Sequence, residues 1–201
     1  MTKTIKLYHG TNTVYNKVDL RKLVGFSEGA GIYMTSSPSY AITYTPLITE
    51  TSFYSIGLKM NKKSTTNHDT EQKETPSIHV VEAPLNLISD ESSKRIPIID
   101  FYVLAKELSI DMDLVKTVNF NDSDYAIFSE MISLLDLVIG VSQYSEEKTK
   151  FYQIMFDFMV EHGYHVIKVP QSTRNMVKVF YIMVDINMFN NGKVYTLDEF
   201  K

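Results

Sequence analysis

The chain of 201 residues contains no cysteine and no tryptophan. Without cysteine the protein has no disulfide bond, no zinc site with thiolate ligands and no catalytic thiol. The absence agrees with a cytoplasmic location, the compartment in which disulfides are rare. Five histidines are present, but no pair of them has a spacing typical of a zinc site, so we expect no bound metal.

Long apolar runs and basic tracts are also missing. No stretch approaches the length of a membrane-spanning helix, and residues 1–7 are too polar for a signal peptide. We therefore expect no association with a membrane. The formal net charge is −4, and this charge does not indicate strong non-specific binding to nucleic acid.

What the chain does contain is enough apolar sequence for one buried core, since 44% of its residues are hydrophobic. We expect a single domain over residues 1–201. It would carry a polar insertion at about 61–75 and a helical insertion at about 95–150. Strands come first, helices are inserted and strands come last, an order that predicts an α+β fold. The expected strands are 5–8, 32–35, 51–60, 78–87, 164–169 and 177–186, and the expected helices are 38–45, 98–108, 123–138 and 146–162.

The clearest helix is the one over residues 146–162. Its apolar residues recur at intervals of three and four, which places them in one stripe on a helix. Gly163 stands where a C-terminal cap is expected. At the first predicted helix, Ser37 and Pro38 are typical of a helix start.

Two short motifs carry the functional argument. Tyr8-His9-Gly10-Thr11 closes the first strand, and Gly29-Ala30-Gly31-Ile32-Tyr33-Met34-Thr35 is a glycine-rich loop that leads into the second. A helix carrying Ala41 and Tyr44 follows. Together these motifs resemble the His-Tyr-Glu branch of the ADP-ribosyltransferases, the group that includes poly(ADP-ribose) polymerases, diphtheria-type toxins and bacterial defence toxins.

The resemblance reaches both ends of the chain, because residues 163–167 and 180–186 are similar to the closing strands of that group. The middle, about 61–150, matches nothing in it. The resemblance implies an ADP-ribosyltransferase fold, in which split antiparallel β-sheets with inserted helices hold NAD⁺ as a substrate.

The resemblance also implies roles for individual residues. His9 would bind the adenosine ribose through one ring nitrogen while the protein holds the other. Gly10 has no side chain, so its backbone would clamp the nicotinamide carboxamide. Tyr33 and Tyr44 would sandwich the nicotinamide ring, because aromatic faces suit a flat cation, and the small Ala41 would leave room for it. Thr11 belongs to the same NAD⁺-binding set.

The third motif position departs from the family. Where the family usually has glutamate, this chain has Phe180, which we expect to form a wall of the NAD⁺ pocket. Chain extension to poly(ADP-ribose) is therefore not expected. Glu28, in the glycine-rich loop, is the first candidate for the missing catalytic carboxylate, ahead of Glu130 and Glu82. Arg174 would pair with the diphosphate.

The expected function is mono-ADP-ribosyl transfer from NAD⁺ to a macromolecule, either protein or nucleic acid, with messenger RNA as one specific option. The small single domain suggests a bacterial or phage toxin, in a toxin–antitoxin or antiphage system, with an antitoxin protein as partner. Two alternatives stay open: a module that binds NAD⁺ or ADP-ribose without catalysis, and an NAD⁺ glycohydrolase. His9, Tyr33 and Tyr44 could also serve packing alone.

Overall fold

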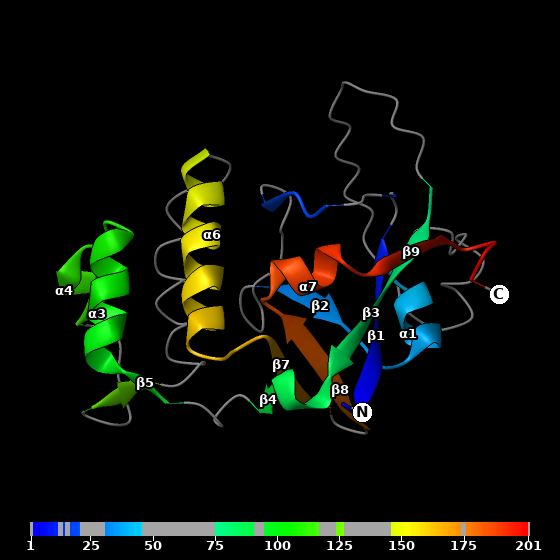
Figure 1. Ribbon diagram of the computed structural model, residues 1–201, viewed down its shortest axis with the longest axis horizontal. Coiled ribbons are helices and arrows are strands. Elements are labelled where there is room, and N and C mark those ends of the chain that lie inside the picture. Colours follow the sequence, from blue (N-terminus) through cyan, green and yellow to red (C-terminus); the bar gives the residue numbers. More distant parts are fainter. Residues whose placement is uncertain are drawn as a thin grey trace.

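A computed structural model of the protein shows two main β-sheets and several helices, an α+β arrangement (Figure 1). The structure describes residues 2–11, 14, 17–20, 31–45, 75–90, 95–116, 124–126, 146–173 and 176–200. The predicted mixture of helices and strands is confirmed.

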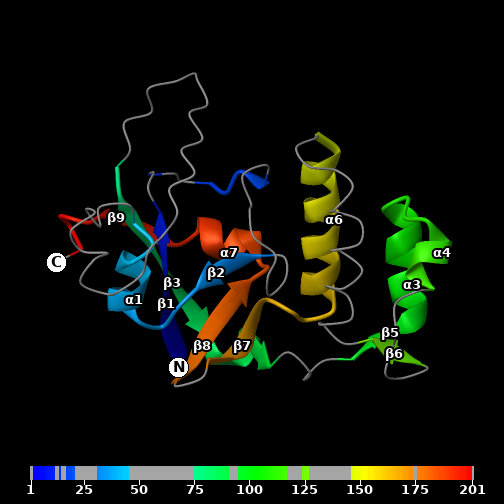
Figure 2. The ribbon, with the colours of Figure 1, turned by 180° about the vertical axis from the view of Figure 1, so that it is seen from behind.

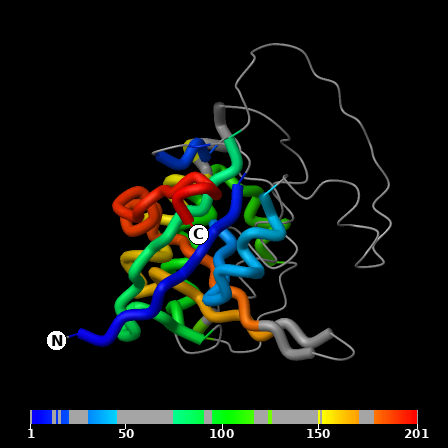
Figure 3. Tube along the Cα trace, turned by 90° about the vertical axis from the view of Figure 1, so that its right-hand side faces the viewer, coloured from blue at the N-terminus to red at the C-terminus, as the bar shows by residue number. Residues whose placement is uncertain are grey.

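The first sheet, sheet A, contains three antiparallel strands in the order β1-β3-β9. These are β1 (Thr4–Thr11), β3 (Ser77–Pro84) and β9 (Lys193–Thr196). Along β1 the side chains alternate: Leu7 is fully buried, whereas Lys6 is exposed. This period of two is what a strand with one buried face requires. Figure 3 shows β1 and β3 running side by side.

Sheet B has the strand order β2-β8-β7-β4. Its members are β2 (Ile32–Met34), β8 (Met176–Met183), β7 (Val166–Thr173) and β4 (Ile88–Asp90). The β2–β8 and β8–β7 pairs are antiparallel, but β4 lies parallel to β7. The expectation of purely antiparallel sheets is therefore wrong at this edge, where a short turn of 3₁₀ helix at Leu85–Leu87 leads the chain from sheet A into sheet B.

Two apolar cores result, one on each face of sheet B. The core between the sheets includes Leu7 and Val81 from sheet A, and Met34 and Met183 from sheet B. The core on the other face of sheet B packs it against the helices. Alternate residues of β8 therefore serve different cores: Tyr181 and Met183 face sheet A, and Ile182 faces the helices.

Helix α6 (Glu146–Glu161) lies next to sheet B (Figure 1). Helix α3 (Ile98–Glu107) packs beyond it, and α4 (Met112–Val115) follows α3. Figures 1 and 2 show α6 between sheet B and α3, with α3 and α4 at the far end of the molecule. A small antiparallel pair, β5 (Ile96–Pro97) and β6 (Tyr125–Ala126), lies at the foot of α3. Among the described residues, no helix combines the length and apolar character needed to cross a membrane.

Several predicted elements are confirmed, among them the helix that becomes α6. Gly163 follows it with a φ of 81°, the left-handed conformation expected of a C-terminal cap. The prediction of a helix over 123–138 is wrong at its start, because residues 125–126 form strand β6, which pairs with β5. The sequence does not predict several short elements, among them β4, β5, α4, β6, α7 (Ile186–Asn190) and β9.

Other predictions concern parts of the chain outside the described residues. These are the strand at 51–60, the polar insertion except for Thr75, and the helix over 127–138. Within the proposed helical insertion, residues 98–107 and 112–115 form the helices α3 and α4.

The helix-side core yields a test of the fold. Phe156 of α6 is 1% exposed and stacks on Tyr152, with 5.9 Å between ring centroids. Phe156→Ala should lower the free energy of unfolding by about 3–5 kcal/mol, because burial of the ring is lost and a cavity remains. Urea denaturation measures this change. Asp157→Ala, on the exposed face of the same helix, is the matched control and should stay within about 0.5 kcal/mol of wild type. Equal effects of the two variants would contradict this packing of α6.

Candidate functional site

The two sheets meet where β1 and β2 lie side by side for a short distance. The backbone N–H of Tyr8 donates to the Thr35 carbonyl (2.8 Å), and the Thr35 N–H donates to the Tyr8 carbonyl (2.9 Å). One residue further along β1, the His9 ring lies 2.8 Å, through Nδ1, from the carbonyl oxygen of Tyr33. Because a carbonyl can only accept, the proton is on Nδ1. The histidine motif and the tyrosine motif are therefore joined by a hydrogen bond.

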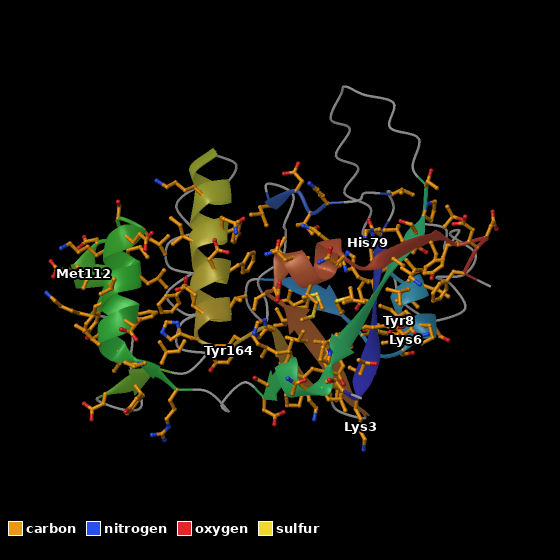
Figure 4. All side chains as sticks on the ribbon, viewed as in Figure 1. Lys3, Lys6, Tyr8, His79, Met112 and Tyr164 are labelled. Carbon is orange, nitrogen blue, oxygen red and sulfur yellow. The ribbon has the colours of Figure 1, made fainter. Side chains whose placement is uncertain are left out.

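Two buried rings pack against the ring of His9, each at a steep angle to it. His79 lies directly opposite His9 in the β1–β3 register, with 6.2 Å between ring centroids. Phe189 of α7 stacks on His79 (5.0 Å, 16°) and meets His9 edge-on (5.8 Å, 79°). His79 and Phe189 are each 2% exposed, and Figure 4 shows His79 beside α7. We call His9, His79 and Phe189 the three-ring cluster.

Both histidines of this cluster favour the neutral form. Burial lowers the pKa of His9, and the hydrogen bond to Tyr33 only partly opposes this. Burial and the neighbouring His9 lower the pKa of His79 to about 4. A neutral His9 with its proton on Nδ1 has a lone pair on Nε2. No group in the described part of the chain is hydrogen-bonded to this Nε2.

The backbone of Gly10 faces the edge of β1 that lies toward β2. Successive residues of a strand direct their N–H and C=O groups to alternate sides, so Gly10 directs its groups to the same edge as Tyr8. At Tyr8 this edge is paired with Thr35. No backbone partner for Gly10 is found on this edge within the described residues. Gly10 therefore presents a donor and an acceptor next to each other, as recognition of a carboxamide requires.

Helix α1 (Pro38–Ile42) packs against the strand at this glycine. Ser37 caps the helix by accepting from the N–H of Tyr40, and Pro38 occupies its first turn. A Cβ on Gly10 would lie 2.0 Å from the carbonyl oxygen of Ala41 and 3.3 Å from Cβ of Tyr44. The lack of a side chain at Gly10 is thus a steric requirement for bringing α1 and Tyr44 to β1.

Next to the contact between α1 and Gly10, the rings of Tyr44, Tyr40 and Phe180 follow one another. The hydroxyl of Tyr44 donates to that of Tyr40 (2.9 Å), and their rings meet edge-on at 5.3 Å. Tyr40 in turn lies 5.8 Å from the ring of Phe180. Tyr44 is 55% exposed, beyond the end of α1 rather than within it as predicted. Partial burial, the hydrogen bond to Tyr40 and the charge of Tyr40 raise the pKa of the Tyr44 phenol.

Tyr33 and Phe180 project from the same face of sheet B. Tyr33 is paired with Ile182, and Phe180 is two residues before Ile182 on β8. The partly buried Tyr33 ring packs on the helix-side core. Opposite Phe180 on β7 lies Val169, so the third motif position has an apolar paired neighbour. Asp185, the acidic residue after β8, accepts from the Met188 N–H and lies 2.9 Å from Nδ1 of His165.

The structure brings together several predicted site residues: His9, Gly10, Ala41 and Tyr44. Tyr33 joins them through its backbone carbonyl, whereas its ring packs on the helix-side core. Phe180 joins them through Tyr40, and Thr11 ends β1 opposite Ser77.

Of the charged candidates, the structure describes Glu82, which lies away from this site. Glu28, Glu130 and Arg174 lie outside the described residues. Glu82 is exposed on the outer face of sheet A, 3.9 Å from Lys6. Because residues 79 and 82 of a strand point to opposite faces, Glu82 is directed away from the three-ring cluster. In the described part of the chain, no group of three or more histidine or carboxylate side chains is arranged to hold a metal ion.

Sequence reasoning missed three side chains of this region. Tyr40 was predicted only as part of a helix, although its spacing of four from Tyr44 indicates contact on a helix. His79 lies within the predicted strand 78–87, and only the β1–β3 register places it against His9. Phe189 belongs to α7, which had no recognised signal.

Comparison of the chain with protein-family models, with curated proteins and with solved structures finds no match.

The contact at Gly10 can be tested directly. In Gly10→Ala the new methyl group would overlap the Ala41 carbonyl, so α1 must move away from β1. Such overpacking costs about 1–3 kcal/mol, measured as the free energy of unfolding in urea. Lys6→Ala changes an exposed residue of the same strand and should stay within about 0.5 kcal/mol of wild type. Unchanged stability of Gly10→Ala would mean that α1 does not lie on Gly10.

Proposed function

We propose that the protein binds NAD⁺ along the β1–β2 junction and transfers its ADP-ribose to a macromolecule as a mono-ADP-ribosyltransferase. The proposal includes the fold: sheets A and B would be the two halves of an ADP-ribosyltransferase core. The observation that carries it is the arrangement around His9 and Gly10. Within the part of the chain that the structure describes, His9 has a ring nitrogen and Gly10 a backbone donor–acceptor pair without hydrogen-bond partners on the β2 side, beside the exposed ring of Tyr44.

Each part of NAD⁺ has a group suited to it. The carboxamide is both donor and acceptor, and it would pair with the N–H and C=O of Gly10. The nicotinamide ring would stack on Tyr44, which Tyr40 holds through the hydroxyl–hydroxyl bond. A ribose hydroxyl would donate to Nε2 of His9. Tyr33 holds the other nitrogen of that ring, so its orientation is set before the ligand arrives.

In the reaction, the bond from ribose C1′ to the nicotinamide nitrogen breaks, and nicotinamide leaves with the electron pair. A nucleophilic atom of the acceptor bonds to C1′ and loses its proton. The enzyme contributes chiefly by holding both reactants in position. Phe180 can neither take up nor release a proton, so a carboxylate elsewhere must orient the acceptor, and Glu28 is the first candidate.

Phe180 also supports the second candidate function, a module that binds NAD⁺ or ADP-ribose without catalysis. Incubation with NAD⁺ labelled in the adenosine separates the possibilities. Label attached to protein or nucleic acid supports transfer, free ADP-ribose supports glycohydrolase activity, and bound but intact NAD⁺ supports the binding module. Failure to bind NAD⁺ would contradict all three.

The first prediction concerns binding. His9→Ala removes the acceptor for the ribose hydroxyl and should weaken NAD⁺ binding by about 1–3 kcal/mol, measured by calorimetry. His162→Ala is a suitable control, because this histidine bonds to Phe158 and Asp100 at the helical end of the protein. Unchanged NAD⁺ affinity in His9→Ala would exclude the assigned ribose contact.

The second prediction concerns the carboxylate. Glu28→Gln retains size and hydrogen bonding but removes the charge. If Glu28 orients the acceptor, transfer at saturating NAD⁺ should fall by about 10²–10⁴-fold while NAD⁺ affinity is retained. Transfer activity within about threefold of wild type would be far above the level expected after loss of an orienting carboxylate. It would exclude Glu28 from this role and make Glu130 the next candidate.

A further inference from the structure

Helix α7 is a short element that depends on a few contacts. It spans five residues, and a helix of this length is not stable by itself. The Asp185 side chain caps its first turn, and the Asn190 side chain accepts a hydrogen bond from the Val18 N–H. The buried residue of the helix is Phe189, whose ring stacks on His79 of β3. The position of α7 on sheet A therefore depends strongly on how well these two rings pack.

Helix α7 shields the imidazole of His79 from water. The His79 side chain is 2% exposed, and Figure 4 shows it beside α7. Two residues after the helix, Gly192 passes close to β3, since a Cβ at this position would lie 2.8 Å from the Val80 carbonyl oxygen. The chain then continues into β9, where Val194 lies opposite His79. Water reaches the imidazole when α7 moves away from sheet A.

The surroundings of His79 oppose a positive charge on its ring. From β1, the titratable ring of His9 faces it with 6.2 Å between centroids. From β9, the apolar Val194 lies opposite in the strand register, and from α7, the ring of Phe189 stacks on it at 5.0 Å. Burial, followed by the neighbouring His9, lowers the pKa of His79 from its ordinary 6.5 to about 4. At pH 5 to 6, His79 therefore takes up a proton when it leaves these surroundings.

We propose that α7 is an acid-sensitive flap, which leaves sheet A when His79 takes up a proton while both ends of the helix stay attached. At its start, Nδ1 of His165 lies 2.9 Å from the Asp185 carboxylate, and a ring nitrogen that donates there keeps its proton in the neutral and the charged imidazole alike. At its end, β9 is paired with β3. Phe189 also meets the ring of His9, so opening removes a packing partner of His9. The proposal is independent of the proposed function.

The direction of the pH effect follows from proton binding in the two states. With α7 closed, His79 takes up its proton at about pH 4. With α7 open, the ring meets water and titrates near the ordinary 6.5 of histidine. Acidification favours the state that binds more protons. The closed form is therefore fully favoured above pH 6.5, the open form gains as the pH falls from 6.5 to about 4, and the gain ends below that.

Hydrogen exchange measures the opening at pH 7.5 and at pH 5. The amides to follow are those of Phe189 and Asn191, which close turns of α7. Their protection factors, which are corrected for the intrinsic effect of pH on exchange, should fall by about 10- to 30-fold between the two conditions, because the open form binds one more proton. Unchanged protection of these amides would overturn the proposal.

The same amides distinguish a local flap from unfolding of the whole protein. A local opening exposes little surface, so exchange in α7 should depend only weakly on urea below the unfolding transition. Exchange that rises with urea as steeply as global unfolding would mean that α7 leaves sheet A only in the unfolded chain, and this result would contradict the flap.

Two variants with the same substitution test whether His79 is the group that takes up the proton. His79→Phe keeps a ring against Phe189 but cannot be protonated, so protection in α7 should lose most of its dependence on pH. His162→Phe is the matched control, because His162 is hydrogen-bonded to Phe158 and Asp100 at the helical end of the protein. This control should respond to pH as wild type does. Loss of α7 protection in acid by His79→Phe, to the same extent as wild type, would refute the role of His79.

A measurement on the wild-type protein serves if His79→Phe does not fold. Nuclear magnetic resonance of the imidazole of His79 should show a neutral ring at pH 6 and a titration midpoint close to pH 4. A midpoint near 6.5, the ordinary value for histidine, would mean that closing α7 does not exclude the proton, and it would overturn the proposal. None of these measurements involves NAD⁺, so this inference and the proposed function are tested separately.

Discussion

The hydrogen bond between His9 Nδ1 and the Tyr33 carbonyl sits where sheet A and sheet B part from each other. Just before it, Tyr8 and Thr35 still pair as neighbouring strands do. Just after it, the chain that follows β2 has turned into α1, and among the described residues Gly10 has a strand neighbour on the β3 side alone. The geometry of the candidate site follows from this separation, because an unpaired strand edge is a surface on which a ligand can take the place of a strand.

The packing behind the site keeps this junction rigid. Leu7 anchors β1 in the core between the sheets, and Met34 anchors β2 in the same core. Phe189 belongs to that core too, while it also stacks on His79. Because a close-packed interior allows little adjustment, the orientation of the His9 ring is coupled to the position of α7. The same apolar contacts that stabilise the fold thereby influence the protonation of one imidazole.

The aromatic side of the site has a different character. Tyr44 is exposed, and its phenol depends on Tyr40, which in turn lies near Phe180. These rings offer flat surfaces for stacking, but Phe180 contributes no charge at the third motif position. On the proposed function, binding of NAD⁺ and activation of the acceptor are therefore separate tasks, carried by different parts of the chain.

The sequence by itself determined the local elements and the contiguous motifs. The strand over 5–8, the helix over 146–162 and the cap at Gly163 depend on residues that are near one another in the chain, and the structure contains all three. Proximity of the His9 and Tyr33 motifs was expected from family resemblance rather than from spacing. The tertiary structure alone decided that His79 faces His9, because strand register depends on pairing between distant segments. It also decided the parallel placement of β4 and the position of Phe189. These features arise from contacts between parts of the chain far apart in sequence, which no local pattern of residues encodes.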